Sequence, residues 1–98
     1  MGNNGVFLQI NRMAFAVDKG KTMEWKDFIV PVLNKAEWDL PDSMRVGQRL
    51  MNALGALHPE IFNAVAGTHF DVWEIDTANF EKLNLFFERV FELFVGAL

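Results

Sequence analysis

The sequence contains no cysteine. Disulfide bonds, thiolate metal ligands and cysteine nucleophiles are therefore excluded together, and nothing points to an oxidising compartment. The sequence patterns of a P-loop, a dinucleotide-binding turn and a serine nucleophile elbow are missing as well. Because so little site chemistry is recognisable, we expect a protein that is not an enzyme and that uses no cofactor or metal.

Long apolar runs are also absent. No stretch reaches the roughly 18 to 20 apolar residues that a membrane-spanning helix needs. No basic segment precedes the first apolar residues, as it would in a secretory signal. We therefore predict that the protein is neither secreted nor inserted in a membrane, and that it is cytoplasmic.

Positive charge is scarce in the second half of the chain. The net charge is −4, and Lys82 and Arg89 are the only lysine and arginine in residues 51–98. A phosphate backbone requires a basic footprint on the protein that binds it. Binding to nucleic acid through this half of the chain is therefore disfavoured.

The composition that remains is that of a globular protein. Of the 98 residues, 51% are hydrophobic and 22% are charged, which places the chain far from the disordered class. A chain of this length buries one core and has little room for a deep catalytic cleft. We predict one domain over residues 1–98.

Hydrophobic periodicity and helix breakers divide the chain into helix-sized pieces. The expected helices cover residues 6–17, 23–33, 44–57 and 59–66, and a last one runs from about residue 78 to the end. Pro59 should take the first position of the fourth helix, and Gly67 should end it. The fold class is therefore all-α, a compact bundle of four to five helices.

Some boundaries depend on single residues. Pro31 should kink or restart the second helix, which Thr22 can cap. We expect a turn at residues 37–43. The expected N-caps are Asp42 or Ser43 for the third helix and Asp76 or Thr77 for the last one. Residues 69–75 are expected to form a loop pinned by Phe70 and Trp73, with a short strand as the alternative.

The last helix is rich in aromatic residues. Its core stripe, about 100° wide, consists of Phe80, Leu83, Phe87, Val90, Phe91, Phe94 and Leu98. Phe86, Leu93 and Ala97 lie beyond this stripe and widen the apolar arc to roughly 200°, about twice what one packed face needs. Either the helix is central in its own chain, or a second copy covers the extra flank. We predict a homodimer formed through Phe86, Leu93 and Ala97.

The third helix carries a polar stripe of Arg45, Gln48, Arg49 and Asn52, because spacings of three and four return to one side of a helix. Guanidinium and carboxamide groups bind planar partners such as carboxylates and phosphates. We predict that this stripe contacts an acidic or phosphate-bearing partner. The alternative is that it satisfies groups inside the domain. Gly47 lies on the opposite side, where its missing side chain lets a neighbouring helix approach closely.

The middle of the chain also resembles a known pattern. The run from Arg45 to Leu54, then Pro59 to Asp71, then Trp73 and Asp76, is similar to the pattern Arg-x-Gly-Gln-x-x-x-Asn, Pro, Gly-Thr-x-x-Asp of short phage and prophage-type proteins. The resemblance implies a small intracellular accessory protein and brings no activity with it. This sequence departs from the pattern at "FDVWEID", where such proteins often read Asp-Pro-Phe.

Two other classes of function stay open. A metal-dependent hydrolase could use the residues His58, His69, Asp71 and Asp76, although the spacing of the two histidines matches no usual ligand pattern. A DNA-binding helix pair could read bases with Arg45 and Arg49. Our first hypothesis is an interaction protein, which self-associates through its last helix and binds another macromolecule, most simply a protein.

Overall fold

The computed structural model describes residues 4–18, 23–76 and 79–97. Within these ranges every regular element is helical, which confirms the predicted all-α class. The elements are α1 (Asn4–Ala16), α2 (Met23–Asn34), the π-helix η1 (Lys35–Asp39), α3 (Val46–Leu57), α4 (Pro59–Val65) and α5 (Phe80–Ala97). The five α-helices match the predicted ones in number and order.

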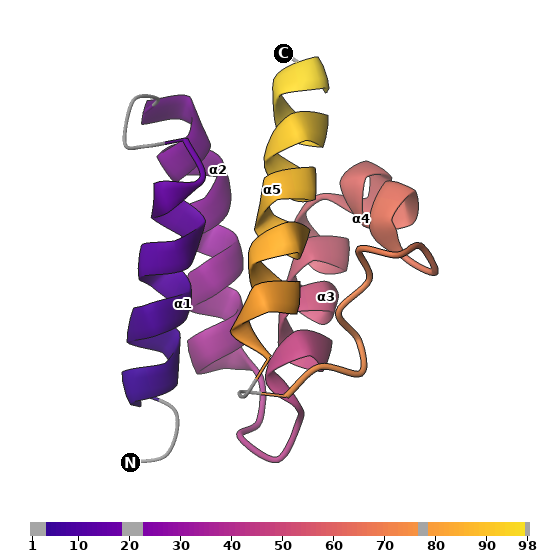
Figure 1. Cartoon of the computed structure of the whole chain (residues 1–98). Coiled ribbons are helices and arrows are strands. Elements are labelled where there is room, and N and C mark those ends of the chain that lie inside the picture. Colours follow the sequence, from indigo (N-terminus) through magenta and orange to yellow (C-terminus); the bar gives the residue numbers. More distant parts are fainter. Residues whose placement is uncertain (1–3, 19–22, 77–78, 98) are drawn as a thin grey trace.

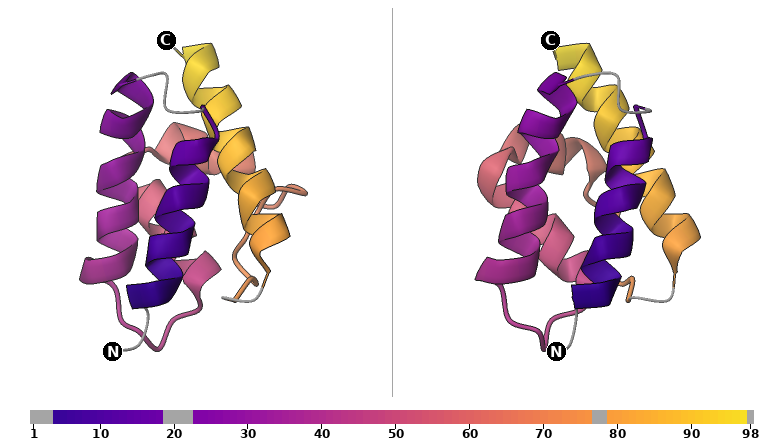
Figure 2. Two further views of the ribbon diagram at one scale, coloured as in Figure 1. Left: turned by 60° about the vertical axis from the view of Figure 1, so that its left-hand side comes forward. Right: turned by 90° about the vertical axis from the view of Figure 1, so that its left-hand side faces the viewer.

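The helices form one bundle in which α5 is flanked by its own chain. α1 and α2 lie side by side and run in opposite directions, and α5 packs against α1 and α4 (Figure 1). In the side views, α1 and α2 stand in front of α3 and α4 (Figure 2). α5 is the longest element at 18 residues. Neither it nor any other helix in the described ranges is long and apolar enough to cross a membrane.

The apolar stripes of the helices meet in one core. Its fully buried members include Phe7, Ile10, Trp25, Leu33, Leu50, Leu54, Leu83, Phe86, Phe87 and Val90. Trp25 joins three helices at the centre of this core. Its indole Nε1 donates a hydrogen bond of 2.8 Å to the carbonyl oxygen of Ala14, and its ring meets the ring of Phe91 edge-on at 5.1 Å. A buried tryptophan is tolerated here because its polar atom has a partner.

Pro31 lies inside α2, and the helix does not restart there. Proline removes one backbone donor, so the carbonyl four residues earlier loses its helical partner. Pro31 is exposed, and water can therefore satisfy that carbonyl. Of the two predicted outcomes, a kink or a restart, the restart does not occur. The predicted cap Thr22 lies outside the described residues.

The segment between α2 and α3 differs from the prediction. Lys35–Asp39 continues α2 as a π-helical turn, so the bend begins only at Leu40. Neither Asp42 nor Ser43 is the N-cap of α3. Arg45 takes that position in an extended conformation, without a side-chain capping bond.

The start of α5 also differs from the prediction. The helix begins at Phe80, and the Oδ1 atom of Asn79 accepts a hydrogen bond of 3.1 Å from the backbone N–H of Lys82. Asn79 is therefore the capping residue. Asp76 lies three residues before it, and Thr77 lies outside the described residues. The terminal Leu98 of the predicted stripe lies outside them as well.

Residues 69–75, which follow α4, form a loop rather than a strand. Gly67 closes α4 with a positive φ of 78°, as glycine at a helix end does. Val72 anchors the loop, since it is completely buried, whereas Trp73 is 37% exposed. Phe70 packs against the core as predicted, but the expected anchoring role of Trp73 is wrong.

Candidate functional site

Arg49 is an internal residue of the bundle. Its side chain is completely buried, its Nε donates to the carbonyl oxygen of Ala36 at 2.8 Å, and its Nη2 donates to that of Glu37 at 2.7 Å. The last carbonyls of a helix have no partner within it, so Arg49 of α3 caps η1 from outside. Asp42, whose side chain is exposed, lies 3.6 Å from Nη2, and the ring of Phe7 lies 5.0 Å from the guanidinium carbon.

The predicted polar stripe therefore does not form one contact surface. Arg49 is not available to a partner, because it holds η1 and α1 to α3. Arg45 is exposed, and its Nε donates to the carbonyl oxygen of Trp73 at 3.2 Å, which ties the loop to the start of α3. Gln48 and Asn52 are half-buried. The prediction that the stripe meets an acidic partner is wrong for Arg49, and an internal role describes its contacts.

The residues predicted for self-association are also separated. Phe86 is 1% exposed and packs edge-on against Phe87 at 5.1 Å, so it belongs to the core. Leu93 is half-buried against the core, and Ala97 is exposed. α5 packs against both α1 and α4, and Phe86 of the extra apolar arc lies within the core of the chain itself. Phe86 therefore cannot form a contact with a second copy.

The residues of the hydrolase alternative do not come together. His58 joins α3 to α4, whereas His69 is exposed in the loop that follows α4. Both oxygens of Asp71 accept backbone hydrogen bonds inside that loop, from Gly67 and Trp73. In the part of the chain that the structure describes, no three His, Asp or Glu side chains are placed to hold a metal ion.

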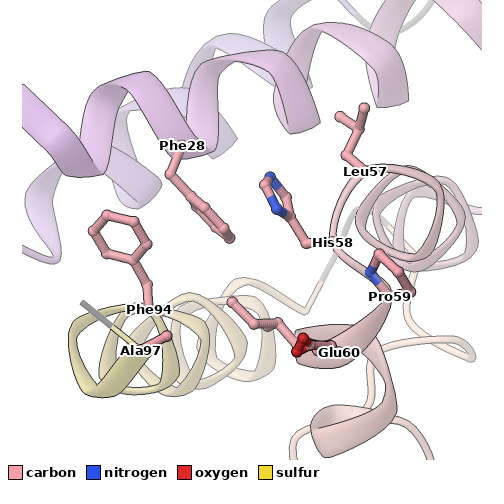
Figure 3. A pocket seen from close by; sticks show the side chains of 8 residues that line it. Phe28, Leu57, His58, Pro59, Glu60, Phe94 and Ala97 are labelled. Carbon is pink, nitrogen blue, oxygen red and sulfur yellow. The ribbon is translucent and has the colours of Figure 1, made fainter.

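A hollow in the surface lies where α2, the junction of α3 and α4, and the end of α5 meet (Figure 3). We call it the apolar groove. It measures about 450 Å³, and its walls include Phe28, Leu57, His58, Glu60, Ile61 and Phe94. Ala97 lines it at the end of α5. The rings of Phe28 and His58 stack with centroids 4.1 Å apart, and those of Phe28 and Phe94 lie 4.7 Å apart.

A second hollow lies beside the first, and Leu57 lines both. We call it the Trp38 hollow. It measures about 400 Å³ and is formed by Pro31, Lys35, Trp38 and Leu57, together with Asn34 and Asp39. Trp38 is 66% exposed and Leu57 is 41% exposed, so two large apolar side chains face the solvent here. The two hollows adjoin at Leu57, and we call them together the apolar surface, although Asn34, Lys35 and Asp39 make the Trp38 hollow partly polar.

This surface was not found by sequence reasoning. Trp38 fell in a segment predicted to be a turn, where an exposed tryptophan carries no periodic signal. Leu57 looked like the last residue of an apolar stripe. The one feature of the sequence that could have indicated this surface is the position of Trp38 between Glu37 and Asp39. A tryptophan flanked by two carboxylates is expected where an apolar surface meets water.

The groove contains a histidine whose protonation is disfavoured. Burial lowers the pKa of His58 from its usual value of 6.5, because the imidazolium loses hydration against Phe28. Glu60 is the carboxylate that lines the same groove. His58 is therefore neutral at pH 7 and contributes an apolar, stacked ring.

This shift predicts how stability changes with pH. Well above pH 6.5 the imidazole is neutral in both the folded and the unfolded state, so it adds no pH dependence there. As the pH falls below 6.5, the unfolded chain takes up the proton first, and stability is lost until the lower folded pKa is passed. We expect the wild type to lose more unfolding free energy between about pH 7.5 and about pH 5.5 than His58→Gln does. Denaturant unfolding at both pH values measures this difference, and His69 cancels because both proteins contain it. Equal losses in the two proteins would contradict it.

Comparison with known proteins gives no relative. No protein-family model, no curated protein and no solved structure matches the chain. The resemblance to phage and prophage-type proteins therefore stays a prediction, and the case for function has to be made from the site itself.

Proposed function

We propose that this protein acts by protein–protein interaction and that its binding surface is the apolar surface formed by the groove and the Trp38 hollow. The observation that carries the proposal is the exposure of Trp38 and Leu57 beside two hollows. Tryptophan is enriched among residues that dominate binding energy, and exposed apolar patches with adjoining pockets mark partner sites. A small accessory protein of the phage type is compatible with this role.

The other exposed apolar residues do not offer such a surface. Leu8 is 53%, Met23 67%, Val95 47% and Trp73 37% exposed, but none of these four residues lines either hollow. Single exposed apolar residues are normal in soluble proteins. The combination of a wide aromatic side chain with concave apolar walls is what supports a docking site.

The positions of the described residues give little support to either alternative function. A DNA-reading helix needs side chains that reach base edges, and Arg49 is buried beneath η1. A metal-dependent hydrolase needs at least three converging ligands, and the described residues provide no such group. These functions are not supported by the placement of their residues.

The proposed surface can be tested by retention of partners. We expect Trp38→Ser with Leu57→Ser to abolish retention of a discrete partner from a lysate of cells that express the protein, while leaving the fold intact. Leu8→Ser is the matched control, because it also removes an exposed leucine from a helix. Partner retention that is the same for the double variant, the control and the wild type would refute the proposed surface. Circular dichroism verifies that all three proteins are folded.

The predicted homodimer stays a prediction with a weaker basis. Phe86 is buried, so Leu93 and Ala97 alone remain of the three predicted contact residues. Light scattering after size exclusion at micromolar concentration measures the mass directly. A homodimer requires about twice 11.2 kDa. A mass near 11.2 kDa would remove the homodimer and leave the apolar surface for a different partner.

A further inference from the structure

The charge around the apolar groove is one-sided. Among the groove's lining residues, Glu60 is the only side chain that is charged at neutral pH, because His58 is neutral. Glu60 lies in the first turn of α4 and is exposed. Among the residues that the structure describes, no lysine or arginine lines this groove. An apolar wall thus meets a negative rim on the α4 side.

A second acidic group precedes the α2 residue that lines the groove. Glu24, Phe28 and Pro31 are spaced by four and three residues, so they follow one side of α2. Glu24 is exposed and lies one turn before Phe28, which forms the groove wall. Asp27 is exposed next to it. Glu60 thus lines the groove itself, whereas Glu24 lies one turn before the α2 residue that forms its wall.

The end of α5 adds to this negative potential. Ala97 is the last residue of α5 and lines the groove, and the last turn of this helix contains no basic residue within its bounds. The free carbonyl groups at the end of a helix carry partial negative charge. A cation near Ala97 would therefore be favoured by the helix as well as by the carboxylates.

Lys35 does not offset these charges at the groove. It lies in the neighbouring Trp38 hollow, where its Nζ is 3.9 Å from a carboxylate oxygen of Asp39. This pair makes the Trp38 hollow close to neutral, while the groove stays negative. The two halves of the surface thus differ in charge but share the apolar side chain of Leu57.

We propose that the groove and the Trp38 hollow bind a positively charged amphipathic helix of another protein. This proposal rests on the proposed interaction function and names the chemistry of the partner. A helix with apolar residues at positions i, i+3, i+4 and i+7 presents anchors to two adjacent hollows. Lysine or arginine beside these anchors would meet Glu60, Glu24 and the end of α5.

A second copy of this chain is a poorer occupant. A symmetric dimer brings the same patch of both copies together, so the rim carboxylates of one copy would face those of the other. The net charge of −4 adds to this repulsion. Complementary charge therefore favours a basic partner over self-association through this surface.

Three helical peptides of about 18 residues, long enough to be partly helical in water, test the proposal. They share one leucine face and differ only in their polar positions, which are all Lys, all Gln or all Glu. We expect the Lys peptide to bind most tightly and the Glu peptide least, with amide chemical-shift changes confined to residues around Phe28, Leu57, Phe94 and Trp38. Binding of the Lys peptide should weaken as salt is added.

Two pairs of variants locate the binding. Leu57→Ser should lower the affinity for the Lys peptide at least about tenfold, because the variant loses a leucine side chain that the bound peptide would cover. Leu8→Ser is its control and should change nothing. Glu60→Gln should lower the affinity by about two- to fivefold, as expected for one exposed ion pair. Glu81→Gln is the matched control, since Glu81 is also an exposed glutamate in the first turn of a helix.

The outcomes separate this inference from the proposed function. Equal binding of the three peptides, or tighter binding of the Glu peptide, would overturn the positive charge of the partner and leave the apolar docking surface in place. Equal weakening by Glu60→Gln and Glu81→Gln would overturn it too, because the attraction would then come from net charge. A dimer in which Trp38 and Leu57 are covered would overturn it in favour of a second copy. The proposed interaction surface itself would be refuted only if the double variant Trp38→Ser, Leu57→Ser retained the partner as well as the wild type does.

Discussion

Gly47→Ala is expected to lower the free energy of unfolding by about 3 kcal/mol or more. A Cβ atom at position 47 would lie 1.7 Å from the carbonyl oxygen of Val72 and 2.9 Å from that of Ile75. These atoms belong to loop backbone, which cannot rotate away as a side chain can. The loop would have to move, and the hydrogen bond of 2.9 Å from the Gly47 N–H to the Ile75 carbonyl would be lost.

Gly55→Ala is the matched control for this variant. Gly55 lies in the same helix, α3, so both variants gain the same helix propensity of about 1 kcal/mol. A Cβ atom at position 55 meets only the ring of Phe62, at 3.1 Å, and a side-chain ring can shift. We expect its stability to stay within about 1 kcal/mol of the wild type. Urea unfolding of both variants measures the difference, and two equal losses would contradict the close approach at Gly47.

Gly47 shows how far local reasoning reaches. A glycine on the apolar side of a helix indicates that some backbone approaches it, and this prediction is correct. The sequence does not indicate which segment approaches Gly47. A neighbouring helix was predicted, but the segment that approaches is the loop around Val72. Close approach is a property of one residue, whereas the identity of the neighbour depends on the packing of the whole chain.

The same distinction separates the other correct predictions from the wrong ones. The helices follow from the spacing of apolar residues, and the helix start at Pro59 follows from the fixed φ angle of proline, so both are local. The π-helical turn at Lys35–Asp39 depends on Arg49, which lies ten or more residues further along the chain. No pattern among neighbouring residues indicates the contact with Arg49, and the segment was therefore predicted to be a turn.

The candidate site was harder to predict than the fold. A spacing of three or four residues placed Arg45 and Arg49 on one stripe, but one is exposed and the other completely buried. Burial depends on what covers each position, and a helical wheel contains only one helix. For the same reason a helical wheel of α5 did not indicate that Phe86 of the wide apolar arc is buried in the core of its own chain.

The charge and burial of Arg49 make it the strongest test of these contacts. Arg49→Ala is expected to lower the free energy of unfolding by about 3 to 5 kcal/mol. Most of this loss comes from the carbonyl groups of Ala36 and Glu37, since a buried acceptor without a partner costs about 1 to 3 kcal/mol. The cavity left beside Phe7 adds to it. Asp42 contributes little, because its side chain is 75% exposed and remains hydrated without the pair.

Two further variants separate these causes, and denaturant unfolding measures all of them. Arg49→Met fills most of the volume but donates no hydrogen bond, so it should remain at least about 2 kcal/mol less stable than the wild type. Arg45→Ala removes an exposed arginine with one hydrogen bond of 3.2 Å and should cost at most about 1 kcal/mol. If Arg49→Met were as stable as the wild type, the capping of η1 by the guanidinium would be unimportant. If Arg49→Ala cost no more than Arg45→Ala, Arg49 would not be the residue that fixes η1, and the position of Trp38 on the apolar surface would need another cause.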